Sequence, residues 1–263
     1  PHRGPAGAEL DQPGLDAKAL LSSDPVSGYF LLNLEPELDC AYSAAALKAL
    51  NDAKFVVCLT PFVSSEMENY ADFILPITNY VGTAGTYVNV EGAWQSFSAI
   101  SLPEGDSKPA WKVLRVLANF LGLTGFDYKT AHEVQHEIKK QVDKMPAQQC
   151  GAHTIHEIKA LQDSLMRLAP WPMYRVNNLV RRSAPLQETL AKDSASIGLN
   201  AATAAKLNFK ERSNVTAIQG DSRVTLPLII NDTLTDGAVL IPAGLNETAG
   251  FGQVEAALIL EQA

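Results

Sequence analysis

The sequence predicts an α/β protein with a parallel-sheet domain over residues 1–178 and a small β-rich domain over residues 179–263. Two observations support this class. Between residues 29 and 76, short apolar runs alternate with short helical segments, a pattern typical of parallel crossover connections. Beyond Arg181, the apolar runs are separated by hairpin signals instead. A length of 263 residues suffices for one large domain or two smaller ones.

Three apolar runs predict the strands of the parallel sheet. They cover residues 29–34, 55–59 and 72–76. The connections carry short helices, one over residues 43–51 with Ser43 as its cap and another beginning at residues 64–68. The stretch 79–95 contains three glycines and predicts a run of turns.

Longer helices follow in the second part of this domain. Asp106 and Pro109 predict the start of a helix with an apolar face made by Trp111, Leu114, Leu117, Phe120 and Leu121. Thr130 and Glu133 predict a capping box for a helix that continues to Val142. A further amphipathic helix is expected near residues 156–168.

Residues 179–263 predict a small β domain. Residues 200–206 read as a short capped helix. Strand-like runs cover residues 215–218 and 224–230, and Gly220-Asp221 between them is a hairpin signal. A third run covers residues 239–242.

Composition excludes several classes of function. The net charge of -8 argues against nucleic acid as a partner, since phosphate binding needs clustered Lys and Arg. The short basic clusters, Lys139-Lys140 and Arg181-Arg182, are interpreted as solvated faces or contacts to a protein partner. No stretch approaches the roughly 18 apolar residues that a membrane span needs, so no direct membrane insertion is expected.

The three cysteines indicate a reducing compartment without a metal cluster. Cys40, Cys58 and Cys150 are widely spaced and odd in number, which does not suit a disulfide framework. An iron–sulfur cluster of the ferredoxin type needs four thiolates, so this segment cannot hold one from its own cysteines. Cys58 lies in an apolar run and is predicted to be a core residue.

One motif could carry metal chemistry. Residues 132–136 read HEVQH and match H-E-x-x-H, in which two histidines bind zinc and the glutamate activates water. Three features weaken a zinc hydrolase interpretation: Glu137 is charged, the flanks are poor in large apolar residues, and Glu133 already serves the capping box. His153 and Glu157 are conceivable third ligands, but an exposed polar helix face, with His132 and His136 on it, is the favoured interpretation.

No other motif assigns a reactive residue. The chain has neither a G-x-S-x-G elbow nor a G-x-x-x-x-G-K-[ST] phosphate loop. Residues 82–85 could offer backbone N–H groups to an anion, although a plain turn is favoured. The sequence therefore assigns no catalytic, cofactor-binding or metal-binding residue in this segment.

The stretch from residue 71 to residue 122 is more specific. It reads ADFILP at 71–76, GTAGTYVNVEG at 82–92, PEGDSKPAW at 103–111 and LANFLG at 117–122. This resembles the molybdopterin oxidoreductase family, whose pattern runs A-D-x-x-L-P, G-T-x-x-N-x-E-G-R-x-Q, P-x-G-x-A/S-x-x-x-W and a helix ending in L-G. The resemblance implies the family's parallel-sheet domain followed by a small, double-psi-like, dinucleotide-binding-like β-barrel.

The departures from the family pattern concern its cofactor site. The family's E-G-R reads Glu91-Gly92-Ala93, so an Arg able to engage cofactor phosphates is missing. The acidic residue that usually precedes G-T is also missing from residues 79–81. Thr83, Asn89 and Glu91 would lie nearest to a former pterin site, and none of them is assigned a function.

Within the family, these departures resemble the molybdopterin-oxidoreductase-like subunit of bacterial NADH:quinone oxidoreductases (respiratory complex I). The resemblance implies a cluster-free scaffold, with iron–sulfur clusters in a preceding part of the parent chain and the other peripheral-arm subunits as partners. It also implies a cytoplasmic location, peripheral on the inner face of the cell membrane. The alternative is the cofactor-binding C-terminal half of a molybdopterin-dependent oxidoreductase such as a formate dehydrogenase.

Overall fold

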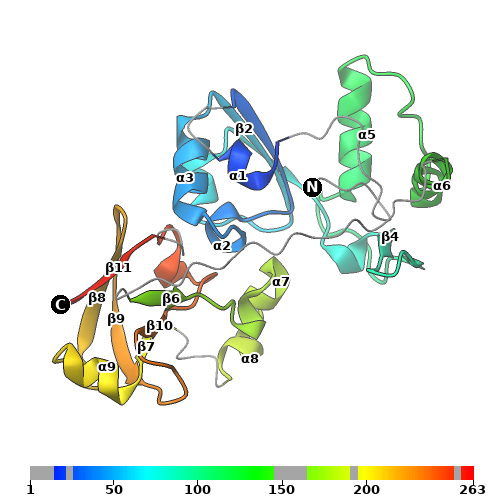
Figure 1. Cartoon of the computed structure of the whole chain (residues 1–263). Coiled ribbons are helices and arrows are strands. Elements are labelled where there is room, and N and C mark those ends of the chain that lie inside the picture. Colours follow the sequence, from blue (N-terminus) through cyan, green and yellow to red (C-terminus); the bar gives the residue numbers. More distant parts are fainter. Residues whose placement is uncertain (1–14, 22–25, 145–164, 190–194, 252–255) are drawn as a thin grey trace.

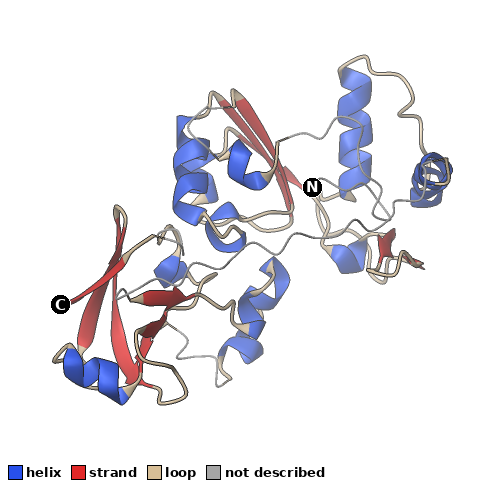
Figure 2. Cartoon of the chain, viewed as in Figure 1, coloured by secondary structure: helices blue, strands red, loops and turns tan. Residues whose placement is uncertain are grey.

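A computed structural model describes residues 15–21, 26–144, 165–189, 195–251 and 256–263. The strands within these ranges form a three-stranded sheet, a six-stranded sheet and a two-stranded hairpin. Figure 1 shows the three-stranded sheet between the six-stranded sheet and a pair of helices, and Figure 2 shows the same view by secondary structure. The predicted mixed α/β class with a parallel sheet is confirmed.

The three-stranded sheet has the order β1-β2-β3 and is parallel throughout. Its strands are β1 (Gly28–Leu32), β2 (Phe55–Thr60) and β3 (Phe73–Pro76). The chain passes from β1 to β2 through α2 (Pro36–Asp39) and α3 (Ser43–Asp52), and from β2 to β3 through α4 (Met67–Tyr70); α1 (Ala17–Leu20) precedes them. The three predicted strands and their crossovers are therefore confirmed.

The two faces of this sheet pack differently. One face carries α3 and α4 over a core made by Tyr29, Leu31, Leu50, Val56, Cys58, Met67 and Tyr70. On the opposite face, Val57 and Leu59 pack with Ile77 against Ala110 and Val113. Cys58 is only 1% exposed, which confirms it as a core residue.

Two local predictions around this sheet are wrong. Ser43 is not the cap of α3, because the cap is Tyr42 and makes no side-chain cap bond; the Ser43 hydroxyl accepts from the Gly250 amide instead. The stretch predicted as turns contains a hairpin of β4 (Gly85–Val88) and β5 (Trp94–Phe97). Asn89 closes this hairpin, since its side chain accepts from two backbone amides of the turn.

The helix α5 (Ala110–Phe120) forms, but its predicted apolar face is largely exposed. Phe120 is 86% and Leu121 66% exposed, because the helix contacts the sheet through its first turns and then extends beyond it (Figure 1). No side chain caps its N-terminus. The helix α6 (Ala131–Val142) has the predicted capping box, in which the Glu133 amide donates to the Thr130 hydroxyl and the Glu133 carboxylate accepts from the Lys129 amide.

The six-stranded sheet has the order β11-β8-β9-β7-β10-β6. Its strands are β6 (Met166–Leu168), β7 (Ile197–Leu199), β8 (Asn214–Gln219), β9 (Ser222–Ile230), β10 (Ala238–Leu240) and β11 (Leu258–Gln262). An antiparallel bridge between Leu165 and Leu258 joins the two ends of this order, so the sheet curls into a small barrel. The predicted hairpin of β8 and β9 around Gly220, and the predicted helix α9 (Ala201–Lys206), are confirmed.

The first barrel strand comes early in the chain. β6 lies before residue 179, so the barrel uses residues on both sides of the predicted domain boundary. Residues 166–168 were expected to end a helix, and this expectation is wrong because they pair with β10. The rest of that expected helix falls mainly on residues 145–164, outside the described residues.

Two short helices connect β6 to β7, α7 (Asn178–Arg181) and α8 (Ala184–Gln187). They lie beside the barrel, and α7 is the nearer of the two to the parallel sheet (Figure 1). Within the described ranges, no helix combines the length and apolar character that crossing a bilayer requires.

Candidate functional site

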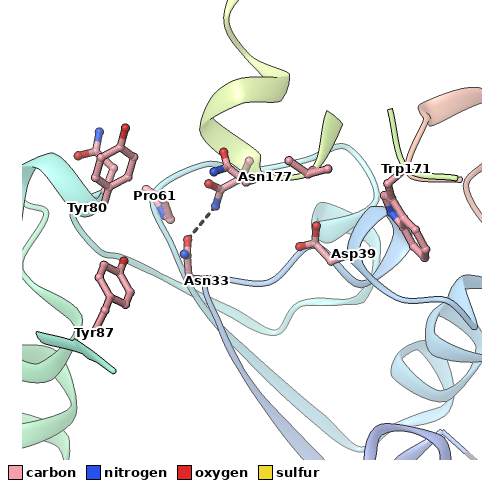
Figure 3. A pocket seen from close by; sticks show the side chains of 10 residues that line it. Asn33, Asp39, Pro61, Tyr80, Tyr87, Trp171 and Asn177 are labelled. Atoms are coloured by element: carbon pink, nitrogen blue, oxygen red, sulfur yellow. Dashed lines mark hydrogen bonds between the residues drawn. The ribbon is translucent and has the colours of Figure 1, made fainter. Parts of the chain in front are cut away.

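A cavity of about 510 Å³ lies where the strands of the parallel sheet end. Asn33 follows β1, Pro61 follows β2 and Asn79 lies shortly after β3, and all three line the cavity. Figure 3 shows Tyr80 and Tyr87 on one side of Asn33 and Trp171 on the other. In open α/β sheets the carboxyl ends of the strands are the usual place for a ligand, so this cavity is the candidate site.

The asparagine side chains of the cavity serve the local backbone. Asn177 Oδ1 accepts from the amides of the first turn of α7, at 3.0 and 2.9 Å. Asn79 Oδ1 accepts from the amides of Val81 and Gly82. These bonds satisfy N–H groups that a helix or turn leaves open at its start. One further bond joins two asparagine side chains of the cavity: Asn178 Nδ2, at the start of α7, donates to Asn33 Oδ1, after β1, at 2.7 Å (Figure 3).

An ion cluster lies beside the cavity. Glu35 is fully buried, and its carboxylate lies 2.9 Å from Arg181 Nη2 and 2.6 Å from Arg182 Nη2. Asp39, which also lines the cavity, lies 2.8 Å from Arg181 Nη1. Two carboxylates and two guanidinium groups thus neutralise one another at this edge of the sheet.

Both arginines have further bonds that hold them in place. Arg181 donates to the Arg175 carbonyl at 2.9 Å. The Arg182 guanidinium lies 4.6 Å from the centre of the Phe62 ring and donates to the Asn178 carbonyl at 2.9 Å. An anion in the cavity could engage Arg181 only by breaking these contacts, whereas the Arg182 side chain is 30% exposed. The Arg181 side chain is 5% exposed, so the predicted solvated face is wrong at this position.

Trp171 attaches the barrel end of the chain to the parallel-sheet domain. Its indole N–H donates to the Leu38 carbonyl at 3.1 Å. The ring packs against Gly244, where an added Cβ would overlap the indole Cδ1. Together with the ion cluster, this contact forms what we call the interdomain clasp: Glu35, Asp39, Arg181, Arg182 and Trp171.

Buried titratable groups lie under the same edge. Glu37 is 3% exposed and accepts from the hydroxyls of Ser64, at 2.5 Å, and Tyr70, at 3.3 Å. Burial, and secondarily the Glu37 carboxylate, raises the pKa of Cys58 to about 11; burial also raises the pKa of Cys40. Thiolates are the reactive form of cysteine, so neither group is suited to act as a nucleophile near neutral pH.

The histidines of the predicted zinc motif lie on the exposed face of α6. His132 and His136 are both exposed, and Glu133 is engaged in the capping box. His132 lines a smaller cavity of about 300 Å³ together with Ser96, which accepts from Gln135 at 2.8 Å. No cluster of three metal-ligating side chains occurs in the described part of the chain. His153 and Glu157 lie outside the described residues.

The glycine turn does not present free amides to an anion at its start, because the Gly82 amide is bonded to Asn79. Asn89 and Glu91 are exposed on the β4–β5 turn, and so is Ala93.

Sequence reasoning missed the interdomain clasp. A weak signal exists in the Glu35-Pro36 pair directly after a strand, since an acidic residue there faces the carboxyl edge of the sheet.

Comparisons with known proteins agree with this fold. Residues 7–120 match the family model described as molybdopterin oxidoreductase. The assimilatory nitrate reductase catalytic subunit of Bacillus subtilis (strain 168) is 30% identical over 136 residues, which are 50% of this chain and 19% of that protein. A protein of Staphylococcus aureus (strain USA300) named as a formate dehydrogenase is 37% identical over 71 residues, 27% of this chain and 7% of that protein.

Among solved structures, acetylene hydratase from Pelobacter acetylenicus superimposes with a TM-score of 0.65 and 16% identity. The match covers 93% of this chain and 46% of the hydratase chain, so this chain spans about half of that protein and a fifth or less of the two enzymes above. At this identity the likeness shows the fold alone. Residues 7–120 are therefore similar to the molybdopterin oxidoreductase family, and the chain as a whole shares the fold of the hydratase.

Proposed function

We propose that the chain is a non-catalytic scaffold: the cluster-free part of the molybdopterin-oxidoreductase-like subunit of a bacterial NADH:quinone oxidoreductase. The observation that carries the proposal is the charge of the candidate site. Within the described part of the chain, Asp39 is the only charged residue that lines the cavity, and the neighbouring arginines are committed to the interdomain clasp.

The site does not fit the cofactor that gives the family its name. A molybdopterin carries a phosphate group, and phosphate sites in proteins use cations or unbonded backbone amides. Here the amides of Val81 and Gly82 are bonded to Asn79, and Arg181 and Arg182 face Glu35. A phosphate in the cavity would meet the carboxylate of Asp39 instead.

The β4–β5 hairpin supports the same conclusion. Ala93 stands where the family pattern has an Arg, and this residue is exposed at the end of a turn. Two amides of the turn, those of Glu91 and Ala93, are satisfied by Asn89 rather than left open. The two features by which this hairpin could engage phosphate, a cation and open amides, are thus both missing at these positions.

A scaffold of this kind supports electron transfer by holding its partners in place. In this proposal the partners are the other peripheral-arm subunits, and the iron–sulfur clusters belong to another part of the parent chain. The complex as a whole would place the segment on the cytoplasmic side of the membrane. No residue of this segment is assigned a catalytic, cofactor-binding or metal-binding role.

A second candidate is the cofactor-binding C-terminal part of a molybdopterin-dependent oxidoreductase. The names of the relatives favour it, since one is a nitrate reductase and another is named as a formate dehydrogenase. It requires a cation that can reach the cofactor, and Arg182, whose side chain is 30% exposed, is the candidate. This requirement gives the two candidates different expected results in the same experiment.

The experiment is purification of the tagged parent protein from its own cells in mild detergent, with mass spectrometry of the co-purified proteins and measurement of molybdenum. An untagged strain is the control. Co-purification of NADH-oxidising and quinone-reducing subunits in fixed ratio, without molybdenum, supports the scaffold. The second candidate predicts one molybdenum atom per chain. It also predicts that Arg182→Ala lowers this content and that the exposed control Lys48→Ala does not, and this result would refute the scaffold.

A further inference from the structure

The segment that carries the arginines of the interdomain clasp has no buried apolar residue. We call residues 172–189, which include α7 and α8, the strap. Arg181 is the one buried residue among them, and no apolar side chain of the strap packs against the buried clusters formed by the described residues. Helix α4 has the same four-residue length as α7 but buries Met67 and Tyr70. Segments with few buried apolar contacts open at a low free-energy cost.

Hydrogen bonds inside the strap join its parts into one unit. Gln187, in α8, donates through Nε2 to the carbonyl of Tyr174 at 3.1 Å and to that of Val180, in α7, at 2.8 Å. Arg181 Nη1 donates to the Arg175 carbonyl, which joins α7 to the turn before it. Contiguous segments that are bonded together in this way open cooperatively rather than residue by residue.

Charged and polar side chains attach the strap to the parallel-sheet domain. The ion pairs of the clasp hold its arginines to Glu35 and Asp39, and Asn178 donates to Asn33 at 2.7 Å. The desolvation cost of buried ions offsets much of their attraction, so such pairs add little net stability. When the strap lifts, both partners of each pair regain water. The strap can therefore leave without unfolding the sheet beneath it.

The attached position also leaves two donors of the strap unsatisfied. The Nε atoms of Arg175 and Arg181 are buried and have no hydrogen-bond partner in the described part of the chain. A buried N–H group without an acceptor costs free energy, because it has lost its bond to water and gained none in return. Lifting the strap restores that bond to water, which offsets part of the loss of the ion pairs.

The strap forms one wall of the cavity at Asn33. Val176, Asn177 and Asn178 line the cavity from the strap, and Figure 3 shows Asn177 next to Asn33. With the strap lifted this wall is absent, and Asn33 is released from its bond with Asn178. The position of the strap therefore sets the size of the molecule that the cavity, about 510 Å³ with the strap attached, can admit.

We propose that the strap is a lid of this cavity, latched by Arg181 and Arg182 on Glu35 and Asp39. In the closed position the arginines neutralise the two carboxylates and the cavity wall is complete. In the open position the strap has moved away from the sheet as one body, and the cavity is wider. The lid rests on the contacts of the strap alone and is compatible with either candidate function.

Native-state hydrogen exchange of the full-length parent at low urea concentrations, followed by mass spectrometry of its peptides, tests the lid. The amides of α7 and α8 should exchange together and faster than those of the equally short α4. Their exchange should depend only weakly on urea, because lifting the strap exposes far less surface than unfolding the sheet. The same urea dependence for the strap and for β2 would overturn the proposal, since the strap would then open only when the sheet unfolds.

Arg181→Met distinguishes a latched lid from a segment that frays residue by residue. The Arg181 side chain bonds to Glu35, Asp39 and the Arg175 carbonyl, none of which is in α8. The lid nevertheless predicts that this variant accelerates exchange in α7 and α8 by the same factor, roughly 10- to 100-fold, because it leaves a buried carboxylate unpaired in the closed position. Acceleration confined to α7 would show fraying and refute the lid.

Two further variants complete this test. Lys48→Met removes the exposed pair with Asp52 and should change exchange in neither helix. Asn178→Ala removes the bond to Asn33 and disturbs no charge, so it remains informative if Arg181→Met does not fold. It should accelerate both helices by a common factor of roughly fivefold, the net contribution of one hydrogen bond. Unchanged exchange in the strap, or acceleration of one helix alone, would contradict the lid.

Discussion

Removing Arg181 tests whether the interdomain clasp holds the two parts of the chain together. In Arg181→Met the apolar stem is retained, but the fully buried Glu35 and the partly buried Asp39 lose a guanidinium at 2.9 and 2.8 Å. Leaving a buried charge without its partner costs about 3–5 kcal/mol. Arg182 remains 2.6 Å from Glu35, so we expect the lower end, about 3 kcal/mol.

The assay is urea unfolding followed by circular dichroism, with the double variant Glu35→Gln/Arg181→Met completing a cycle. The double variant should lose less stability than the sum of the two single variants, because it leaves no unpaired carboxylate at position 35. Lys48→Met, which removes the exposed pair with Asp52, is the control and should leave the midpoint unchanged. A loss below about 1 kcal/mol in Arg181→Met, or strict additivity in the cycle, would refute the reasoning.

Three further predictions follow from other residues. Burial raises the pKa of Cys58 from 9.0 to about 11. Above pH 9 the unfolded chain therefore binds fewer protons than the folded chain. The contribution of this thiol to the free energy of unfolding is complete below pH 9 and is lost as the pH rises toward 11. Urea unfolding at pH 9 and at pH 11 should show a smaller loss of stability between the two for Cys58→Ala than for the wild type. An equal loss in both proteins would contradict the role given to Cys58. Gly244→Ala places a Cβ on the Trp171 indole and should cost about 2 kcal/mol or more in thermal unfolding. Gly220→Ala, also at positive φ but with open space around it, should cost about 1 kcal/mol, and similar losses for both would show that the indole contact is unimportant. Equilibrium dialysis should give the same zinc content for the wild type and His132→Ala, whereas a loss of stoichiometric zinc would revive the metal hypothesis.

Local sequence predicts the parallel sheet well because its strands are continuous apolar runs. Val56, Val57, Cys58 and Leu59 are all buried, as a strand covered on both sides requires. The prediction that the apolar face of α5 is buried was wrong, because it depended on contacts outside the helix. The spacing of Phe120 and Leu121 indicates an amphipathic helix, but periodicity does not reveal how much of that helix reaches a partner.

The candidate site could not be predicted because its decisive contacts join distant positions. Arg181 meets Asp39 across 142 residues, and the pair Arg181-Arg182 by itself looks like a surface cluster. Trp171 likewise finds its acceptor at Leu38, 133 residues away. The family resemblance was recoverable because its motifs lie close together between residues 71 and 122, within the stretch where local patterns are most informative.

The bridge between Leu165 and Leu258 affects the order of events during synthesis. Ribosomes release the β1–β3 segment early, and its contacts are mostly between neighbours in the chain, so this unit can fold while translation continues. β6 must instead wait for β10 and β11, which are the last strands to emerge among those described. Until then Arg167, the buried residue of β6, lacks its acceptor at Ile241. A chain truncated before residue 258 also leaves the edge of β8 uncovered, so it should be prone to aggregation and to chaperone binding.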